Sequence, residues 1–308
     1  PVLAIVGPTA SGKSDLALSL AERLGAEIIN ADASQLYRGM DIGTAKVPLE
    51  QRRGIAHHQL DVLDIGAEAS VAAYQRQARA DLRVIQGRGR QAILVGGSGL
   101  YVRAALDELD IPPRDAAVRV RLEAQLAERG IEALREKLRA LDPRAHERIE
   151  ARNGRRIVRA LEVIELTGRP FSATLPTGRF AVPTVLIALR VPREQLDARI
   201  ERRTRAMWAQ GFLHEVEGLA ARGLAETRTA SRAVGYPQAQ AQLAGECTQA
   251  EAIAATAAAT RRLVRRQESW WRSDTRVAWI EAADGSNEQD LAGRTLDLLR
   301  AGDDGSAE

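Results

Sequence analysis

Apolar and polar positions follow two patterns along the chain, and the first pattern fills the N-terminal third. Short apolar runs predict buried strands at 2–7, 26–33, 91–99 and 184–191. Amphipathic stretches predict helices at 13–24, where Gly25 ends the pattern, at 70–87 and from about 100 onward. Strands that alternate with helices are typical of a parallel sheet with right-handed crossovers.

The second pattern is helical and heavily charged, and it begins after Pro112-Pro113. From about 114 to 167 the helical spacing is broken at Gly130, at Asp142-Pro143 and at Asn153-Gly154. A connector rich in Gly, Pro, Ser and Thr follows at 167–183. Beyond the last apolar run the pattern is helical again, at 193–210, at 212–222 and from a capping box at 248–251 to about 271.

These changes predict an α/β fold in which helices flank a parallel sheet and a helical domain is inserted into the chain. The predicted segments are the first part of the α/β core at 1–112, a helical insertion at 113–183, the return to the core with C-terminal helices at 184–300, and a flexible tail at 301–308. Ligands of such sheets bind at the carboxyl ends of the strands, so functional residues are expected just after the apolar runs.

A phosphate-binding pattern follows the first apolar run. Residues 7–14 match G-x-x-x-x-G-K-[ST] and lie between a predicted strand and a predicted helix, which makes the fold P-loop NTPase-like. Backbone N–H groups and the helix N-terminus bind phosphate, a lysine adds positive charge, and a serine hydroxyl can bind Mg²⁺. The phosphate-binding residues are Gly7, Pro8, Thr9, Ala10, Ser11, Gly12, Lys13 and Ser14.

The motif does not identify the phosphate compound. Enzymes that use ATP usually place a carboxylate at the end of a neighbouring strand to hold Mg²⁺, whereas the apolar run at 91–99 ends in Gly96-Gly97-Ser98-Gly99. Small residues there let a ligand approach the backbone closely. The nearest carboxylate is Asp32, which can bind a metal, act as a general base or cap the following turn.

The composition is typical of a soluble globular protein, but its charge is unevenly distributed. Apolar residues make up 45% and charged residues 28%. No apolar run approaches the ~20 residues that span a bilayer, and the first residues lack a signal-peptide pattern. We therefore expect no membrane association and a cytoplasmic protein, in line with the single cysteine, Cys247. The net charge is only +3, yet arginines cluster at 152–163 and 261–272, as on a nucleic-acid-binding face or an ordinary solvated helix.

Seven short motifs occur together and in one order. They are GPTASGKS (7–14), DASQLYRGMDIGTAK (32–46), HHQLD (57–61), GGSGLY (96–101), RALEV (159–163), AVGYPQA (233–239) and RRQESWWR (265–272). From residue 3 to about 272 the chain therefore resembles the tRNA dimethylallyltransferase (isopentenyl-diphosphate:tRNA transferase) family. Many unrelated NTPases share the first motif, whereas GMDIGTAK close to a phosphate loop is far more specific.

The resemblance implies transfer of a dimethylallyl group from dimethylallyl diphosphate to N6 of the adenosine 3′-adjacent to the anticodon in tRNA. It makes Asp32 the base that accepts the N6 proton, and it places Thr9 against the bridging oxygen. Arg203 would neutralise the departing diphosphate, together with the phosphate loop and Mg²⁺ near Ser14. The loop would then hold a leaving group that is discarded, not a phosphate donor.

The resemblance also implies contacts with the tRNA anticodon stem-loop and makes the helical insertion at 113–183 a tRNA-binding domain. The positions are Asp32, Ala33, Ser34, Gln35, Ser98, Arg119, Arg155, Arg156, Arg159, Arg232, Gly235, Tyr236, Arg265, Arg266, Gln267, Trp270 and Arg272. Stacking on Trp270 or Trp271 suits single-stranded RNA, although a tryptophan at the end of a helix equally fits core packing. We expect a monomer, since nothing in the sequence requires a partner chain.

Two alternative functions remain open on the sequence. A small-molecule or nucleotide kinase would account for the phosphate loop alone, and an RNA-binding protein with a regulatory phosphate loop would account for the arginine clusters. Gly96-Gly97 at a strand end and the basic insertion disfavour the kinase. A prenylated adenosine formed from unmodified tRNA and dimethylallyl diphosphate would separate the transferase from both.

Overall fold

The computed structural model of the protein describes residues 1–174 and 178–304 and divides into two compact units. The first unit joins the chain up to Leu106 to the chain from Phe180 onward, and the second spans Asp107–Arg179. Both borders lie a few residues before those predicted at 113 and 183. The Arg159 guanidinium donates to the carbonyls of Pro112 and Pro113 at 2.8 Å, so the proline connector folds with the second unit.

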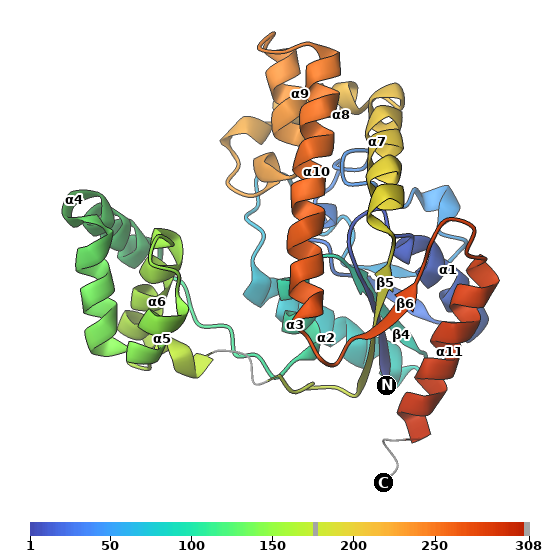
Figure 1. The fold of residues 1–308 in the computed structure, drawn as a ribbon, viewed down its shortest axis with the longest axis horizontal. Coiled ribbons are helices and arrows are strands. Elements are labelled where there is room, and N and C mark those ends of the chain that lie inside the picture. The colour runs from blue at the N-terminus through green and yellow to red at the C-terminus, as the bar shows by residue number, and fades with distance from the viewer. Residues whose placement is uncertain (175–177, 305–308) are drawn as a thin grey trace. The chain divides into compact units, whose positions relative to one another are not determined.

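A parallel sheet of six strands forms the centre of the described part of the first unit, which confirms the predicted fold class (Figure 1). The spatial order is β3-β2-β4-β1-β5-β6. Strands β1 and β4 are fully buried, which is why their sequences are unbroken apolar runs. The strands are β1 (Val2–Val6), β2 (Glu27–Asn30), β3 (His57–His58), β4 (Ala92–Gly96), β5 (Thr184–Arg190) and β6 (Ala278–Glu281).

The two edge strands were not predicted from the sequence. Strand β3 has only two residues, and β6 lies at the opposite edge of the sheet with most of its residues partly exposed. A short, half-exposed strand does not need a continuous apolar run, so it leaves little pattern in the sequence. The expectation that the chain beyond β5 is entirely helical is therefore wrong for β6.

Helices cover both faces of the sheet. Helices α1 and α11 pack against each other and one face, whereas α2 and α3 pack together on the other (Figure 1). Helices α7 and α10 lie side by side and extend beyond the sheet where β5 leads into α7. The α-helices of this unit are α1 (Lys13–Leu24), α2 (Val71–Gly87), α3 (Gly99–Leu106), α7 (Arg193–Ala209), α8 (Phe212–Ala220), α9 (Tyr236–Leu243), α10 (Gln249–Arg272) and α11 (Glu288–Asp304). Short 3₁₀ helices are η1 (Ala33–Leu36), η2 (Leu49–Gln51), η4 (Leu224–Glu226) and η5 (Ala230–Arg232).

The C-terminal helix runs further than predicted. Helix α11 continues to Asp304, so residues 301–304 of the predicted flexible tail are helical, and residues 305–308 lie outside the described chain. The capping box predicted at 248–251 is confirmed at the start of α10. Across the described ranges, no helix is both long and apolar enough to cross a membrane.

The second unit is helical in its described part, and the three predicted breaks are confirmed. Gly130 is non-helical, with φ 77° and ψ 170°, and kinks the first helix, while the side chains of Asp142 and Asn153 cap the next two. The helices enclose an apolar core of their own. They are α4 (Ala116–Leu141), α5 (Pro143–Arg148) and α6 (Gly154–Thr167), followed by the 3₁₀ turn η3 (Phe171–Thr174).

Gly96, at the carboxyl end of β4, is required by the close approach of the chain after β2. A Cβ atom on Gly96 would lie 2.2 Å from the carbonyl oxygen of Ala31. We expect Gly96→Ala to lower the free energy of unfolding by about 1–3 kcal/mol, the usual cost of overpacking. Gly66→Ala is the matched control, because a Cβ there has no heavy atom within 4 Å. Urea titration measures both variants, and equal stabilities would contradict this packing requirement.

Candidate active site

The phosphate loop lies between β1 and α1, as its sequence predicts. Gly7 and Gly12 adopt φ values of 138° and 90°, and Ala10 adopts φ 65°, a left-handed conformation uncommon for a residue with a Cβ. The Lys13 Nζ atom donates to the carbonyl oxygen of Pro8 at 3.2 Å. The lysine therefore lies against the loop whose N–H groups, with the N-terminus of α1, form an anion-binding site.

Thr9 and Arg203, distant in the sequence, meet at this loop. The Nη1 atom of Arg203, on α7, donates to the Thr9 Oγ1 atom at 3.2 Å. The backbone N–H of Thr9 donates to Gln267 Oε1 at 3.0 Å. The resemblance implied that Thr9 and Arg203 act on the same leaving group, and the structure brings their side chains into contact.

Two cationic groups beside the loop, Lys13 and Arg203, are half-buried. Burial, followed by the charge of Arg203, lowers the pKa of Lys13 to about 8. Burial also lowers the pKa of Arg203. The carboxylates of Asp32 and Asp15 oppose both shifts without reversing them. The two cations are thus only partly compensated, and a bound anion carrying several charges would stabilise them.

Asp32 follows β2 and is held by short polar contacts. Its backbone N–H donates to Asn30 Oδ1 at 3.0 Å, and Asn30 Nδ2 donates to the Asp32 carbonyl at 3.0 Å. Its carboxylate Oδ1 accepts the Ser34 N–H at 2.9 Å and so caps η1. The capping interpretation is therefore correct for one oxygen. The other oxygen, Oδ2, has no hydrogen-bond partner among the described residues and can therefore accept a proton.

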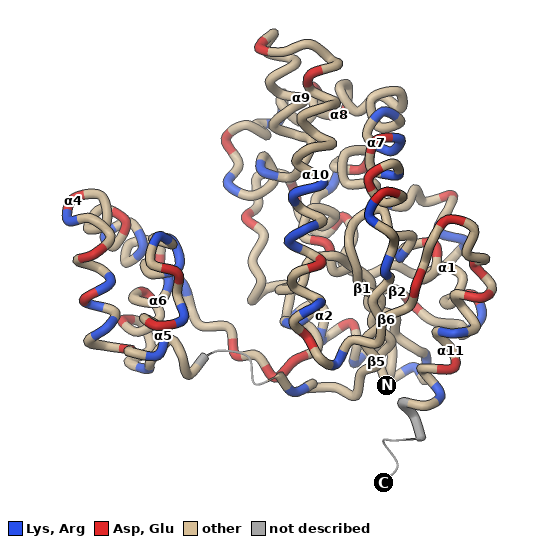
Figure 2. The backbone as a smooth tube through the Cα atoms, in the orientation of Figure 1, with Lys and Arg blue, Asp and Glu red and all other residues tan. Residues whose placement is uncertain are grey.

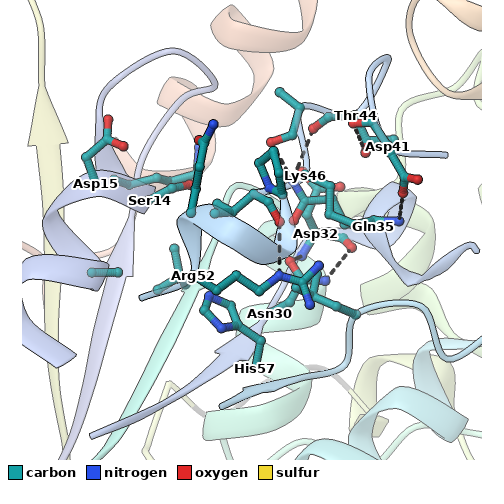
Figure 3. A pocket seen from close by; sticks show the side chains of 18 of the residues that line it. Ser14, Asp15, Asn30, Asp32, Gln35, Asp41, Thr44, Lys46, Arg52 and His57 are labelled. Carbon is teal, nitrogen blue, oxygen red and sulfur yellow. Dashed lines mark hydrogen bonds and ion pairs between the residues drawn. The ribbon is translucent and has the colours of Figure 1, made fainter. Parts of the chain in front are cut away.

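Two cavities open at this edge of the sheet. The larger, about 720 Å³, contains Ser14 and Asp32 in its lining and reaches Arg52 and His57 (Figure 3). The smaller, about 230 Å³, is lined by residues of α10 and η5. The residues common to both cavities are Thr9, Asp32, Thr44, Arg203 and Met207. The candidate catalytic side chains therefore lie where the two cavities meet.

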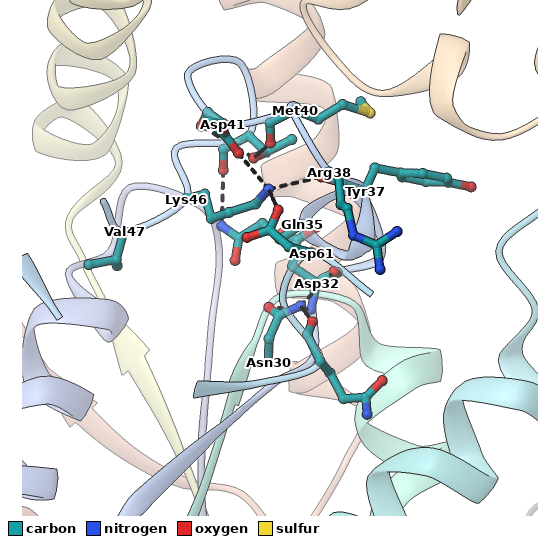
Figure 4. A network of polar contacts seen from close by, with 12 residues as sticks. Asn30, Asp32, Gln35, Tyr37, Arg38, Met40, Asp41, Lys46, Val47 and Asp61 are labelled. Atoms are coloured by element: carbon teal, nitrogen blue, oxygen red, sulfur yellow. Dashed lines mark hydrogen bonds and ion pairs between the residues drawn. The ribbon is translucent and has the colours of Figure 1, made fainter. Parts of the chain in front are cut away.

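Lys46 organises the loop that forms one wall of the larger cavity (Figure 4). Its buried ammonium donates to Asp41 Oδ1 at 2.6 Å, to Asp61 Oδ1 at 2.5 Å and to the Tyr37 carbonyl at 2.9 Å. These three acceptors match the three N–H donors of an ammonium group. The motif GMDIGTAK pointed to this segment, but it did not indicate that Lys46 holds it together.

No pattern in the sequence predicted the role of Glu215. Its carboxylate, on α8, accepts the backbone N–H groups of Asp41, Ile42 and Gly43 at 3.0, 2.7 and 3.3 Å. The Tyr236 hydroxyl donates to the same carboxylate at 2.7 Å. An acidic residue on an amphipathic helix is usually solvated, so nothing in the local sequence signalled this contact.

Side chains of α10 occupy the space beside the glycine turn after β4. A Cβ on Gly97 would lie 2.3 Å from Gln267 Nε2, and a Cβ on Gly99 would lie 2.2 Å from Trp270 Nε1. The expectation that these small residues make room for a ligand is therefore wrong for Gly97 and Gly99. They make room for two side chains of α10.

Several residues expected to contact RNA are exposed in the first unit. They are Arg232, Arg265, Arg266, Trp270 and Arg272. Figure 2 shows the run of basic residues along α10. Arg232 and Arg266 also line the smaller cavity, and the Arg103 guanidinium lies 5.1 Å from the centre of the Trp270 ring. The exposed ring and cations leave this face suited to RNA.

Other residues expected at the RNA are buried. Tyr236 is 0% exposed and Gly235 is also buried, so neither is exposed to a bound RNA in this structure, and their RNA contact stays a prediction. Gln267 is 9% exposed and is bonded within the protein. Of the two adjacent tryptophans, Trp271 belongs to the core at 0% exposure, whereas Trp270 is 37% exposed. Core packing is thus confirmed for Trp271, whereas stacking of RNA on Trp270 stays a prediction.

In the second unit, two of the expected RNA-binding arginines are engaged by a buried carboxylate. Glu162 accepts hydrogen bonds from Arg119 and Arg159. Burial alone would raise the pKa of Glu162, but the bonds from these arginines outweigh it and lower the pKa. Arg155 and Arg156 are exposed near the start of α6. The structure therefore gives Arg119 and Arg159 a stabilising contact within their own unit.

A comparison with known families matches residues 35–274 to IPP transferase. The chain belongs to the IPP transferase family. This confirms the resemblance that the motifs carry. The chain is 55% identical to a tRNA dimethylallyltransferase of Nocardioides sp. over 99% of this chain and 97% of that protein. It is 57% identical to one of Streptomyces avermitilis over 92% of this chain and 90% of that protein.

The fold is also that of a solved member of the IPP transferase family. The full-length tRNA isopentenylpyrophosphate transferase of Bacillus halodurans is 36% identical to this chain. The match covers 100% of this chain and 99% of that protein, with a TM-score of 0.74. Membership of the IPP transferase family supports prenyl transfer over the two alternatives, a kinase and an RNA-binding protein with a regulatory phosphate loop.

The lowered pKa of Lys13 predicts a pH-dependent affinity for diphosphates. As the pH rises through about 8, the ammonium loses its proton and its attraction for an anion weakens. We expect the affinity for dimethylallyl diphosphate to fall by up to roughly tenfold per pH unit above that value. Titration calorimetry without RNA measures it. Lys13→Ala should bind more weakly and lack this step, and the same pH dependence in both proteins would contradict the assignment.

Proposed function

We propose that the chain transfers the dimethylallyl group of dimethylallyl diphosphate to N6 of the adenosine 3′-adjacent to the anticodon of tRNA and releases diphosphate. The observation that carries this proposal is the junction of two cavities, which Thr9, Asp32 and Arg203 all line. A phosphate loop on one side and arginines on the other suit a diphosphate donor and an RNA acceptor. The names of its relatives support the same activity.

The phosphate-loop side of the junction suits the leaving group. When the allylic C–O bond breaks, its electron pair stays on the diphosphate, whose negative charge rises at the bridging oxygen. Lys13, Arg203 and the loop N–H groups are positioned beforehand to stabilise that charge. Because Thr9 Oγ1 accepts from Arg203, its own proton is free to be donated to the bridging oxygen.

Asp32 is the base of the proposed reaction. The adenine N6 atom attacks the allylic carbon, forms the new C–N bond and gives up a proton. The Ser34 N–H orients the carboxylate through Oδ1, and Oδ2 accepts the proton. An exocyclic amine is a weak nucleophile, so its alignment with the carbon matters as much as the base.

The smaller cavity suits a single extruded nucleotide. A base cannot react at its exocyclic amine while it is stacked in the RNA, so it has to leave the stack. Arg232 and Arg266 line this cavity and can pair with the phosphates beside the extruded base. Trp270 offers an exposed ring on which a neighbouring base can stack.

The residues present fit a Mg²⁺ ion that is held mainly by the substrate. Within the described ranges no group of three His, Cys, Asp or Glu side chains could hold a metal. Mg²⁺, however, is commonly bound by one or two protein oxygens together with phosphates and water. The Ser14 hydroxyl lines the larger cavity next to Lys13 and would be the protein ligand. When bound, the ion would add positive charge at the departing diphosphate.

Asp32→Asn tests the proposed base. The amide keeps the size of the side chain and an acceptor for Ser34, but it cannot take up the N6 proton. We expect the rate of transfer to unmodified tRNA to fall by about 10²–10⁴-fold, while tRNA binding persists. Mass spectrometry of the nucleosides measures transfer, and filter binding measures affinity.

The exposed Asp290 of α11 provides a matched control. Asp290→Asn should retain the wild-type rate. A wild-type rate in Asp32→Asn would exclude Asp32 as the base. No dimethylallyl adenosine with the unaltered protein would refute the proposed function itself.

A further inference from the structure

Gln267 is a buried polar residue on a helix whose neighbouring side chains face solvent. It is 9% exposed, whereas Arg265, Arg266 and Trp270 are exposed. Burying an amide is unfavourable unless its polar atoms are bonded. Here Oε1 accepts the Thr9 backbone N–H at 3.0 Å, and Nε2 donates to the carbonyl oxygen of residue 97 at 3.1 Å.

One side chain thereby joins the phosphate loop, the turn after β4 and α10. An amide is the side-chain group that offers an acceptor and a donor in the same plane at this length. Its orientation follows from its partners, because the Thr9 N–H can only donate and the Gly97 carbonyl can only accept. Glutamate would lack the donor, and methionine would lack both bonds.

Both hydrogen-bond partners of Gln267 lie close in the structure to the proposed reacting groups, Thr9 and Asp32. Thr9 carries the hydroxyl at the junction of the two cavities. The turn after β4 continues into Ser98, whose Oγ accepts the Ala33 N–H at 3.4 Å, next to Asp32. A shift of the Gln267 side chain would therefore displace Thr9 directly, and it would displace Asp32 only indirectly, through the turn after β4.

We propose that Gln267 is a positioning residue that aligns Thr9 with the bridging oxygen of the diphosphate and ties this alignment to RNA bound on α10. The inference rests on the proposed function. Helix α10 is continuous from Gln249 to Arg272, so contacts on its exposed arginines and Gln267 belong to one rigid element. The resemblance implied that Gln267 touches RNA, and Gln267 does line the smaller cavity. Both polar atoms of its amide are bonded within the protein, which makes it an internal link between the RNA face and the phosphate loop.

Gln267→Met tests the positioning, because methionine keeps the length of the side chain and makes neither hydrogen bond. We expect kcat to fall about 10²-fold, the usual effect of misplacing a reacting group by about 1 Å. The KM values for tRNA and for dimethylallyl diphosphate should change little. Gln249→Met, exposed at the other end of α10, should retain the wild-type kcat. A wild-type kcat in Gln267→Met would overturn the inference.

A double-mutant cycle separates positioning from general packing. Thr9→Val removes the hydroxyl through which Gln267 acts, so the double variant should lose no more kcat than the worse single variant. Losses that multiply would overturn the inference. If thermal melting shows Gln267→Met to be unfolded, Gln267→Glu takes its place in the cycle, with the same two outcomes. An unaltered protein that forms no dimethylallyl adenosine would instead refute the proposed function.

Discussion

Two half-buried cations at the carboxyl edge of the sheet set the conditions for the rest of the site. Lys13 comes from the phosphate loop and Arg203 from α7, and burial lowers the pKa of both. Asp32 and Asp15 offset their charges only in part. A multivalent anion bound beside this pair would stabilise both cations. A diphosphate gains negative charge as it leaves, so the positive charges of Lys13 and Arg203 stabilise the transition state more than the bound substrate.

The surrounding framework keeps these groups in place before any substrate binds. Lys46 donates hydrogen bonds to Tyr37, Asp41 and Asp61, and Glu215 accepts the backbone N–H groups of residues 41–43. Gln267 joins the phosphate loop to α10. These contacts link segments that are far apart in the sequence, so the loops cannot adjust independently. Preorganisation of this kind is how a protein stabilises developing charge without paying for rearrangement at the moment of reaction.

Local patterns were predictable from the sequence, and contacts between distant segments were not. The central strands, the phosphate loop and the helix breaks depend on neighbouring residues, and the structure bears them out. The edge strand β6 was not predicted, because a half-exposed strand needs little apolar sequence. The contacts of Glu215 and the internal role of Gln267 were not predicted, because their partners lie in other segments. For the same reason Trp270 and Trp271 could not be told apart, although one faces solvent and the other the core.

That the loop holds a leaving group and not a phosphate donor is tested most directly by following phosphorus during turnover. Phosphorus NMR of a reaction with unmodified tRNA and dimethylallyl diphosphate should show one inorganic diphosphate formed for each dimethylallyl adenosine. Neither orthophosphate nor a phosphate ester on the RNA should appear. Release of orthophosphate in step with turnover, or phosphate transferred to the RNA, would contradict the account.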